Sequence, residues 1–319
     1  IYSTKVAKDR MISSFFGKTK PINYIVLAIF LFLFYFANIF FQLKEQRINE
    51  VIPLEILLFV TLLLAVFIIN LIVRTEKATE FNSYAMVFFV LLIVAFSDEL
   101  VLQNVIFANF FLLLAFWRIL SIKSIRNVKS KIFDASLLIT IASLFYDWAI
   151  AFMLLVFFVI LVYDRKTFKN WLVPFLGMAT IFILTFTVLQ LKGSLSFFEE
   201  HYQFSLGLFT TKSFFQVLNV KTLIYLILTV IVSILVFVRL RNVSGGKLLL
   251  LRIVFLVFLL GTGIIFFTPA DASPVLITFF PAAVFLTNYF ESIKKRKLQE
   301  VVLILSIVIA LVLFAFHLK

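Results

Sequence analysis

Residues 81–120 decide the fold, and they read FNSYAMVFFVLLIVAFSDELVLQNVIFANFFLLLAFWRIL. Two long apolar runs flank a short polar stretch that holds Ser97-Asp98-Glu99 and Gln103-Asn104, and the amide of Asn109 lies deeper in the second run. A polar group placed in hydrocarbon is costly unless it is paired or hydrated. The stretch therefore predicts either a turn between two helices at the surface of a membrane or a polar cavity.

The composition of the whole chain indicates a membrane protein. Of its 319 residues, 63% are hydrophobic, 44 are phenylalanine and only 14% are charged, and the mean hydropathy is +1.15. Soluble domains carry roughly half apolar and about a quarter charged residues, so a water-soluble globule is excluded. The apolar runs lack the two-residue alternation of outer-membrane strands, and backbone groups in lipid must be hydrogen-bonded within the chain. The predicted fold class is all-α, a polytopic bundle of transmembrane helices.

Eleven apolar runs are predicted to be membrane spans. They cover residues 22–41, 51–73, 81–97, 100–120, 133–146, 148–163, 171–191, 221–240, 248–267, 274–290 and 298–316. As helices, the runs 133–146 and 148–163 would rise only about 21 and 24 Å, short of the roughly 30 Å hydrocarbon core. They are either two short spans or one re-entrant hairpin, and a hairpin would reduce the number of spans to nine.

The basic residues predict the orientation of these helices. If the N-terminal head is cytoplasmic, 23 of the 29 lysines and arginines fall in inside segments. The six that fall outside are Lys44, Arg47, Lys192, Lys212, Lys221 and Lys319. Because cytoplasmic loops are enriched in Lys and Arg, we predict that the N-terminus lies inside and the C-terminus outside. The same distribution accounts for the net charge of +13 without a nucleic-acid partner.

The chain is predicted to form one membrane domain. Residues 1–20 are a basic cytoplasmic head, in which we expect Met11 to be the native initiator and residues 1–10 an upstream extension. Residues 21–319 form a single transmembrane domain whose longest outer loop is 192–220. Within that loop, residues 196–204 predict an amphipathic interfacial helix with phenylalanines toward lipid and glutamates toward water. Pro281 lies in the middle of a predicted span and should kink it.

Carboxylates gather on the predicted outer face. Asp98, Glu99 and Asp147 are the candidate catalytic residues, because a carboxylate can act as a general base or bind a metal ion. Asp147 is flanked by Tyr146 and Trp148, which resembles a sugar-contacting arrangement. The same three residues would equally make an ordinary interfacial aromatic belt.

The candidate substrate-binding residues lie on the same predicted face. Gln103 and Asn104 fall in the first turns of a helix that begins near Leu100, where free N–H groups and the positive end of the dipole favour an anion. Hydrogen bonding between helices would explain these amides equally well. The full set is Gln103, Asn104, Asn109, His201 and Asp271.

No cofactor or metal site is evident in the sequence. The chain has no cysteine and only two histidines, His201 and His317, which cannot build a multi-histidine iron or zinc site. The segment 261–263 lies inside a predicted span with no strand before it, so it indicates close packing of helices and not a nucleotide-binding loop. A divalent cation would be compatible with the outer carboxylates if the protein were a transferase.

Three segments carry a resemblance to known proteins. Met11–Asn23, Asn109–Arg118 and Phe133–Tyr146 resemble an uncharacterised family of bacterial multi-pass inner-membrane proteins. This resemblance covers nearly the whole chain. It implies a location in the bacterial inner membrane and no particular activity.

A second resemblance concerns the layout of the chain. The pair Asp98-Glu99, the segment 196–204 and the stretch 268–281 are arranged in a way similar to the GT-C superfamily of polyprenyl-phosphate-dependent glycosyltransferases. The first outer loop, 42–50, is shorter here than in that superfamily. The resemblance implies a role in envelope biogenesis, with a polyprenyl-phosphate-linked substrate handled at the outer leaflet and membrane lipid as the surrounding partner.

The residues alone leave two other classes of function open. In a transporter or flippase, Asp98, Asn109, Asp134 and Asp147 would line a path and Pro281 would mark a hinge. Asp134 also follows Lys129 and Lys131, which indicates a structural ion pair with one of them. A non-catalytic membrane scaffold would need none of these roles.

Overall fold

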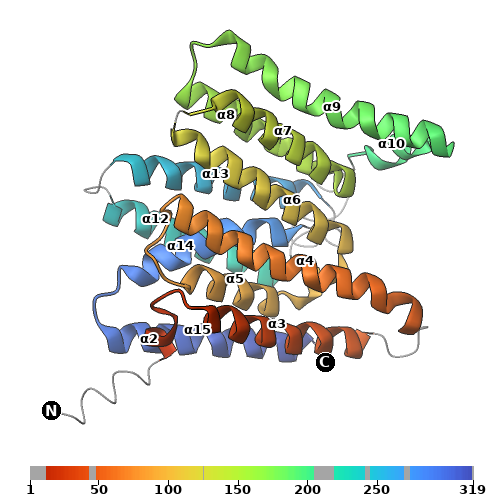
Figure 1. The fold of residues 1–319 in the computed structure, drawn as a ribbon. Coiled ribbons are helices and arrows are strands. Elements are labelled where there is room, and N and C mark those ends of the chain that lie inside the picture. The colour runs from red at the N-terminus through yellow and green to blue at the C-terminus, as the bar shows by residue number, and fades with distance from the viewer. Residues whose placement is uncertain are drawn as a thin grey trace. The chain divides into compact units, whose positions relative to one another are not determined.

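The computed structural model describes residues 12–42, 48–124, 126–204, 219–240, 245–268 and 274–317. Within these ranges every regular element is a helix, which confirms the all-α fold class (Figure 1). Seven helices of the described part are long and apolar enough to cross a membrane. They are α3 (Pro21–Gln42), α4 (Ile48–Thr75), α6 (Gln103–Leu120), α9 (Phe168–Lys192), α12 (Val220–Leu240), α13 (Gly245–Phe267) and α15 (Arg296–His317).

The remaining elements are shorter. They are α2 (Ile12–Phe16), α5 (Tyr84–Ala95), η1 (Ser97–Val101), η2 (Ser121–Ser124), α7 (Val128–Phe145), η3 (Asp147–Phe152), α8 (Met153–Tyr163), α10 (Ser196–His201), η6 (Val275–Thr278) and α14 (Phe279–Glu291). Each of the eleven predicted runs coincides with helix in the structure. That all eleven cross a bilayer stays a prediction.

The helices are grouped into two compact units, each built from segments that are distant in the sequence. The first unit comprises Ile1–Val101, Tyr225–Leu248 and Phe279–Lys319, and the second comprises Leu102–Ile224 and Leu249–Thr278. The expectation of one transmembrane domain over 21–319 stays a prediction.

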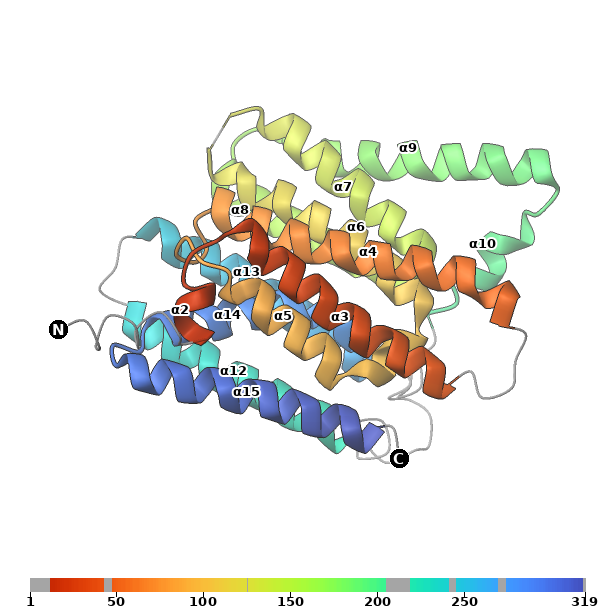
Figure 2. The ribbon, with the colours of Figure 1, turned by 60° about the horizontal axis from the view of Figure 1, so that its bottom comes forward.

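Helices α5 and α14 form the core of the first unit. Every residue of α5 except Leu92 is buried, and ten residues of α14 are buried. The Phe290 ring lies 4.5 Å from that of Tyr84, and the Phe279 ring lies 6.4 Å from that of Phe89. Helices α3 and α15 contact α5 (Figure 1 and Figure 2). Both helices also carry large exposed apolar side chains. The short helix α5 is therefore covered by other helices of the unit, while the longer helices α3 and α15 provide exposed apolar surface.

Pro281 lies close to a change of helix type and not in the middle of one regular helix, and the predicted kink itself stays a prediction. The single-turn η6 ends at Thr278 and α14 begins at Phe279, so Pro281 lies in the first turn of α14. Backbone N–H groups of a first helical turn have no intrahelical partner, so a proline there removes no hydrogen bond. The hydrophobic pattern showed one continuous run, and Pro281 itself was the sequence signal for an irregularity near this point.

Several segments predicted to lie inside meet at one end of the first unit. The carboxylate of Glu300 accepts hydrogen bonds from the backbone N–H groups of Ile12 and Ser13, both at 2.8 Å. The side-chain amide of Asn23 donates to the hydroxyl oxygen of Ser83 at 2.8 Å. The N-terminal head, the loop before α5 and the start of α15 therefore share one end, as the charge distribution predicted.

Two contacts mark the opposite end of the same unit. The Tyr35 hydroxyl donates to the carboxylate of Glu55 at 2.7 Å, and the Asn38 amide donates to the Ser97 carbonyl at 3.1 Å. The ends of α3 and α5 that were predicted to lie outside thus meet each other. Which side of a membrane each end faces stays a prediction.

In the second unit, α7 packs along both α6 and α9 (Figure 1). The Phe145 ring of α7 lies 5.3 and 5.6 Å from the rings of Phe107 and Phe111 of α6. Helix α7 has 18 residues and begins at Val128, five positions before the predicted run. Its first turns are polar, so a rule based on hydrophobicity alone underestimates its length.

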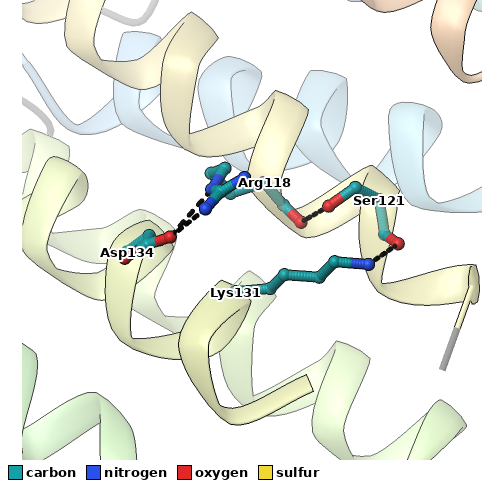
Figure 3. A network of polar contacts seen from close by, with 4 residues as sticks. All are labelled: Arg118, Ser121, Lys131 and Asp134. Carbon is teal, nitrogen blue, oxygen red and sulfur yellow. Dashed lines mark hydrogen bonds and ion pairs between the residues drawn. The ribbon is translucent and has the colours of Figure 1, made fainter. Parts of the chain in front are cut away.

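An ion pair joins the C-terminal end of α6 to the N-terminal part of α7 (Figure 3). Arg118 donates from Nε to Oδ2 of Asp134 at 2.9 Å, and its terminal nitrogen Nη2 reaches the same oxygen. The ammonium group of Lys131 donates to the Ser121 carbonyl at 2.6 Å. Asp134 is therefore a structural ion-pair partner, as expected, but the partner is Arg118 and not Lys129 or Lys131.

Close packing predicted at 261–263 is confirmed at Gly261 and not at Gly263, where a Cβ atom would meet nothing within 4 Å. A Cβ atom at Gly261 would lie 2.8 Å from Cγ2 of Thr278, which belongs to η6 in the same unit. Only a residue without a side chain permits this approach of α13 to η6.

Candidate functional site

The polar stretch at 97–109 is divided between the two units. Asp98 and Glu99 lie on η1 of the first unit and are half-exposed. Gln103 and Asn104 open α6 of the second unit, the first half-buried and the second exposed. Their catalytic and substrate-binding roles stay predictions.

Asn109 lies inside the second unit with only 1% of its surface exposed. Neither Nδ2 nor Oδ1 of its amide has a hydrogen-bond partner among the described groups. The hydrogen bond between helices that would explain this residue is therefore not formed. A buried polar group left unpaired costs about 1–3 kcal/mol, so its presence calls for a reason other than packing.

We expect Asn109→Leu to stabilise the protein by about 1 kcal/mol, because leucine removes an unpaired amide from a buried site. The measurement is the thermal unfolding midpoint of the purified protein in detergent. Asn23→Leu is the matched control, because Asn23 is fully buried and its amide donates to Lys18 and Ser83. The control should lose stability, and a loss of similar size in Asn109→Leu would contradict the prediction.

Two of the predicted site residues, Asp147 and His201, lie near the same end of α7 in the second unit. Helix α9 ends at Gly193, whose φ of 68° reverses the chain, and α10 then leads back to the end of α7. There, Nε2 of His201 lies 2.7 Å from the carbonyl oxygen of Ser143, so this nitrogen is the donor. The Tyr202 hydroxyl lies 3.0 Å from the Ser143 hydroxyl.

Asp147 lies next to this contact, at the start of η3. Its Oδ1 accepts a hydrogen bond from the backbone N–H of Trp148 at 2.8 Å. Burial raises the pKa of the Tyr202 hydroxyl; the Ser143 hydrogen bond lowers it, and the Asp147 charge raises it. The phenol therefore stays protonated at neutral pH and can donate a hydrogen bond beside the aspartate.

Aromatic rings surround these polar groups. The Trp148 indole stacks nearly parallel to Phe267 of α13, with centroids 6.1 Å apart, and meets the edge of Phe204 at 5.4 Å. Phe197 stacks on the His201 ring at 4.8 Å. Nε1 of Trp148 is buried and has no hydrogen-bond partner among the described groups. We call Ser143, Asp147, Trp148, His201 and Tyr202 the aromatic–carboxylate cluster.

A helix is present over Ser196–His201, within the predicted segment 196–204, and its position at a membrane interface stays a prediction. Glu199 and Glu200 are exposed, while Phe197 and Phe198 are half-buried. Phe198 packs against Phe182 of α9, with ring centroids 6.4 Å apart. Asp271, the remaining predicted binding residue, lies outside the described residues.

A second group of polar side chains lies in the first unit, and the sequence did not point to it. Oε1 of Glu291 accepts hydrogen bonds from the Asn82 amide at 2.6 Å and from the Glu80 backbone N–H at 3.0 Å. Glu291 lines a cleft with a volume of about 140 Å³. The other lining residues are Glu80, Val236, Arg239, Leu240, Lys247, Asn288 and Ser292. We call this the Glu291 cleft.

The environment of the Glu291 cleft shifts the pKa of the Glu291 carboxyl group toward neutral pH. Burial raises the pKa of Glu291 to about 7, although the Asn82 hydrogen bond and the Lys247 charge act to lower it. Glu291 directly follows the predicted span 274–290, so this group lies outside the membrane-spanning segments. It changes charge close to neutral pH.

Comparison with known proteins adds a family but no activity. A family described as "Family of unknown function (DUF6427)" matches residues 20–319. The chain belongs to this family. No curated protein and no solved structure matches the chain. The DUF6427 match extends over both units, in agreement with the resemblance to an uncharacterised family of membrane proteins.

Sequence reasoning missed part of each site in this DUF6427 protein. Tyr202 and Ser143 complete the aromatic–carboxylate cluster, yet 59 positions separate them in the sequence. Glu291 was overlooked because its partner Asn82 lies 209 positions away. In both sites, the only available signal was a polar residue at the end of an apolar run.

No group of three or more His, Asp or Glu side chains among the described residues could hold a metal ion. The chemistry open to the aromatic–carboxylate cluster is thus hydrogen bonding from Tyr202, His201 and Trp148, acceptance by Asp147, and ring contact. That combination suits a polyhydroxylated or amphiphilic headgroup.

Proposed function

We propose that this membrane protein binds the headgroup of a lipid-linked substrate at the outer leaflet, through the aromatic–carboxylate cluster. The observation that carries the proposal is the return of α10 to the end of α7, which brings His201 and Tyr202 to Ser143 and places the Tyr202 hydroxyl within the electrostatic influence of Asp147. A carboxylate among aromatic rings next to an interfacial helix can bind sugar hydroxyls while the lipid tail stays in the bilayer. The finer proposal is a GT-C-like transfer reaction in envelope biogenesis at the bacterial inner membrane.

In the transferase version of this proposal, Asp147 orients the sugar. The roles predicted for Asp98 and Glu99 of the first unit, as a base or as ligands of a divalent cation, and for Gln103 and Asn104, in orienting the substrate, stay separate predictions. In the transporter or flippase alternative, Asp134 would line a path and Pro281 would mark a hinge. The ion pair between Asp134 and Arg118 favours a structural role for Asp134, and Pro281 lies in the first turn of α14.

The orientation required by this proposal can be tested by labelling single cysteines. The chain has no cysteine, so Glu199→Cys and Lys295→Cys each create a unique and exposed thiol. We expect an impermeant reagent to label position 199 on intact cells, and position 295 only after the membrane is opened. The opposite pattern would contradict both the orientation and the assignment of an outer site.

Trp148 provides a direct probe of substrate binding. The protein has three tryptophans, so Trp117→Phe combined with Trp171→Phe leaves Trp148 as the sole indole. We expect its fluorescence in nanodiscs to change when a polyprenyl phosphate carrying a hexose is added. The change should exceed that caused by the polyprenyl phosphate without sugar.

Asp147→Asn in this background should weaken binding of the sugar-bearing lipid at least tenfold, because a hydrogen bond to a charged group contributes about 1.5–3 kcal/mol. Glu200→Gln is the matched control, since it removes the same charge from an exposed position on α10. Equal responses to the two lipids, or an unchanged affinity in Asp147→Asn, would contradict the proposed function.

A further inference from the structure

The Glu291 cleft combines two cations and two carboxyl groups at one end of the first unit. Arg239 lies in the last turn of α12, and Lys247 lies in the first turn of α13. Glu80 lies in the loop before α5, and Glu291 ends α14. Four separate segments thus contribute charge to a space of about 140 Å³, which holds several water-sized groups.

The protein orients both kinds of charge. The Arg239 guanidinium donates to the Ser292 hydroxyl and lies 5.1 Å from the centre of the Tyr289 ring. Oε1 of Glu291 is held by Asn82 and by the Glu80 backbone. Groups fixed in advance lose little conformational entropy when a ligand binds. A fixed guanidinium beside a lysine is a common way to bind a phosphate group.

The surface beside the cleft indicates how a lipid would approach. On α12, Leu235 is 40% exposed and Val238 is 67% exposed, immediately before Arg239. An acyl chain along this apolar face would place its headgroup at the guanidinium. Basic pockets at the cytoplasmic ends of transmembrane helices bind anionic headgroups, and the charge distribution predicts that this end is cytoplasmic.

We propose that the Glu291 cleft binds the phosphate group of an anionic ligand, and that the charge state of Glu291 makes this binding depend on pH. This site is separate from the aromatic–carboxylate cluster and does not depend on its function. Arg239 and Lys247 supply the attraction, and Glu291 opposes it only when ionised.

The direction of the pH dependence follows from the groups that face Glu291. These are Glu80 and Asn82 from the loop, Lys247 from α13, Arg239 at the end of α12, and Tyr84 of α5. With Glu291 neutral, the two cations face one carboxylate, and the cleft is positive. With Glu291 ionised, the two cations face two carboxylates, and the cleft has no net charge. Phosphate binding should therefore be tighter below pH 7 than above it.

The test uses the full-length protein in phosphatidylcholine nanodiscs, titrated at pH 6 and at pH 8. The lipid probe is short-chain phosphatidylglycerol and the soluble probe is dimethyl phosphate; both keep one negative charge across this range. We expect the dissociation constant for the bound probe to rise about tenfold from pH 6 to pH 8. In Glu291→Gln this pH dependence should disappear, and the affinity at pH 8 should match that of the wild type at pH 6.

Lys247→Gln should weaken binding about tenfold at both pH values, because it removes a half-exposed cation that lines the cleft. Lys294→Gln is the control, since it removes the same charge from an exposed position outside the cleft, and it should change nothing. Both substitutions are at the surface, and unchanged helical content and melting temperature would verify folding.

The two probes separate the sources of the phosphate. Binding of phosphatidylglycerol alone identifies a lipid headgroup, and equal binding of dimethyl phosphate identifies a free phosphate ligand. Each result supports the proposal if Lys247→Gln weakens the binding. Binding of neither probe, an affinity unaffected by Lys247→Gln, or a pH dependence that persists in Glu291→Gln would overturn it.

Discussion

Replacing Gly177 by leucine is expected to lower the free energy of unfolding by about 3 kcal/mol, the upper part of the range for overpacked cores. Gly177 lies where α9 packs against α7. A Cβ atom there would be 2.8 Å from Cβ of Ser136, and 3.1 Å from the backbone nitrogen of Leu137 and the carbonyl oxygen of Phe133. Two of these three atoms belong to the backbone, so a change of rotamer cannot relieve the clash.

Gly263→Leu is the matched control for this substitution. Gly263 also lies within a long apolar helix, but a Cβ atom there would have no neighbour within 4 Å. The control should keep its stability, because leucine favours the helix and enters open space. The measurement is the unfolding midpoint in detergent. Equal midpoints for the two variants would contradict the close approach of α7 and α9.

A double-mutant cycle can assign the clash to its partner. Gly177→Ala introduces only the Cβ atom, and Ser136→Gly removes the side-chain atom that it meets first. The double variant should recover part of the lost stability, since the two backbone contacts at 3.1 Å remain. Recovery by Ser136→Gly would show that α7 and α9 pack through this pair of small residues.

The helices could be predicted from the sequence because their cause is local. A run such as 221–240 is apolar throughout, and a chain in lipid satisfies its backbone only by forming a helix. The structure departs from the prediction where the ends of helices are not set by hydrophobicity. Val128 begins α7 with a polar first turn, and Pro281 is tolerated because η6 ends just before α14. The hydrophobic pattern contains neither piece of information.

The candidate sites could be predicted only in part, because the interactions that build them are not local. Asp147 and His201 were selected separately as outer polar residues, and the sequence did not place them together. Their association depends on the chain reversal at Gly193 and on the hydrogen bond to Ser143. Glu291 was not among the residues predicted from the sequence, since nothing in the sequence shows that Asn82 will bind it.

The pH dependence of stability is expected to reveal the buried carboxyl group of Glu291. Its pKa is raised from an ordinary value of 4.5 to about 7, chiefly by burial. Between these values the folded state binds more protons than the unfolded state, so the free energy of unfolding falls as the pH rises from 4.5 to 7. The contribution is complete below pH 4.5 and is lost above pH 7.

Glu291→Gln should remove this loss. Glutamine keeps an oxygen that can accept hydrogen bonds from Asn82 and Glu80 but carries no charge at any pH. At pH 8 the variant should be more stable than the wild type by about 1–2 kcal/mol, after allowance for solvent screening of this half-buried group. At pH 4.5 the two should be nearly equal.

Glu200→Gln, at an exposed position, is the control and should follow the wild type at every pH. Parallel stability curves for Glu291→Gln and the wild type would mean that Glu291 titrates as an ordinary surface carboxyl group.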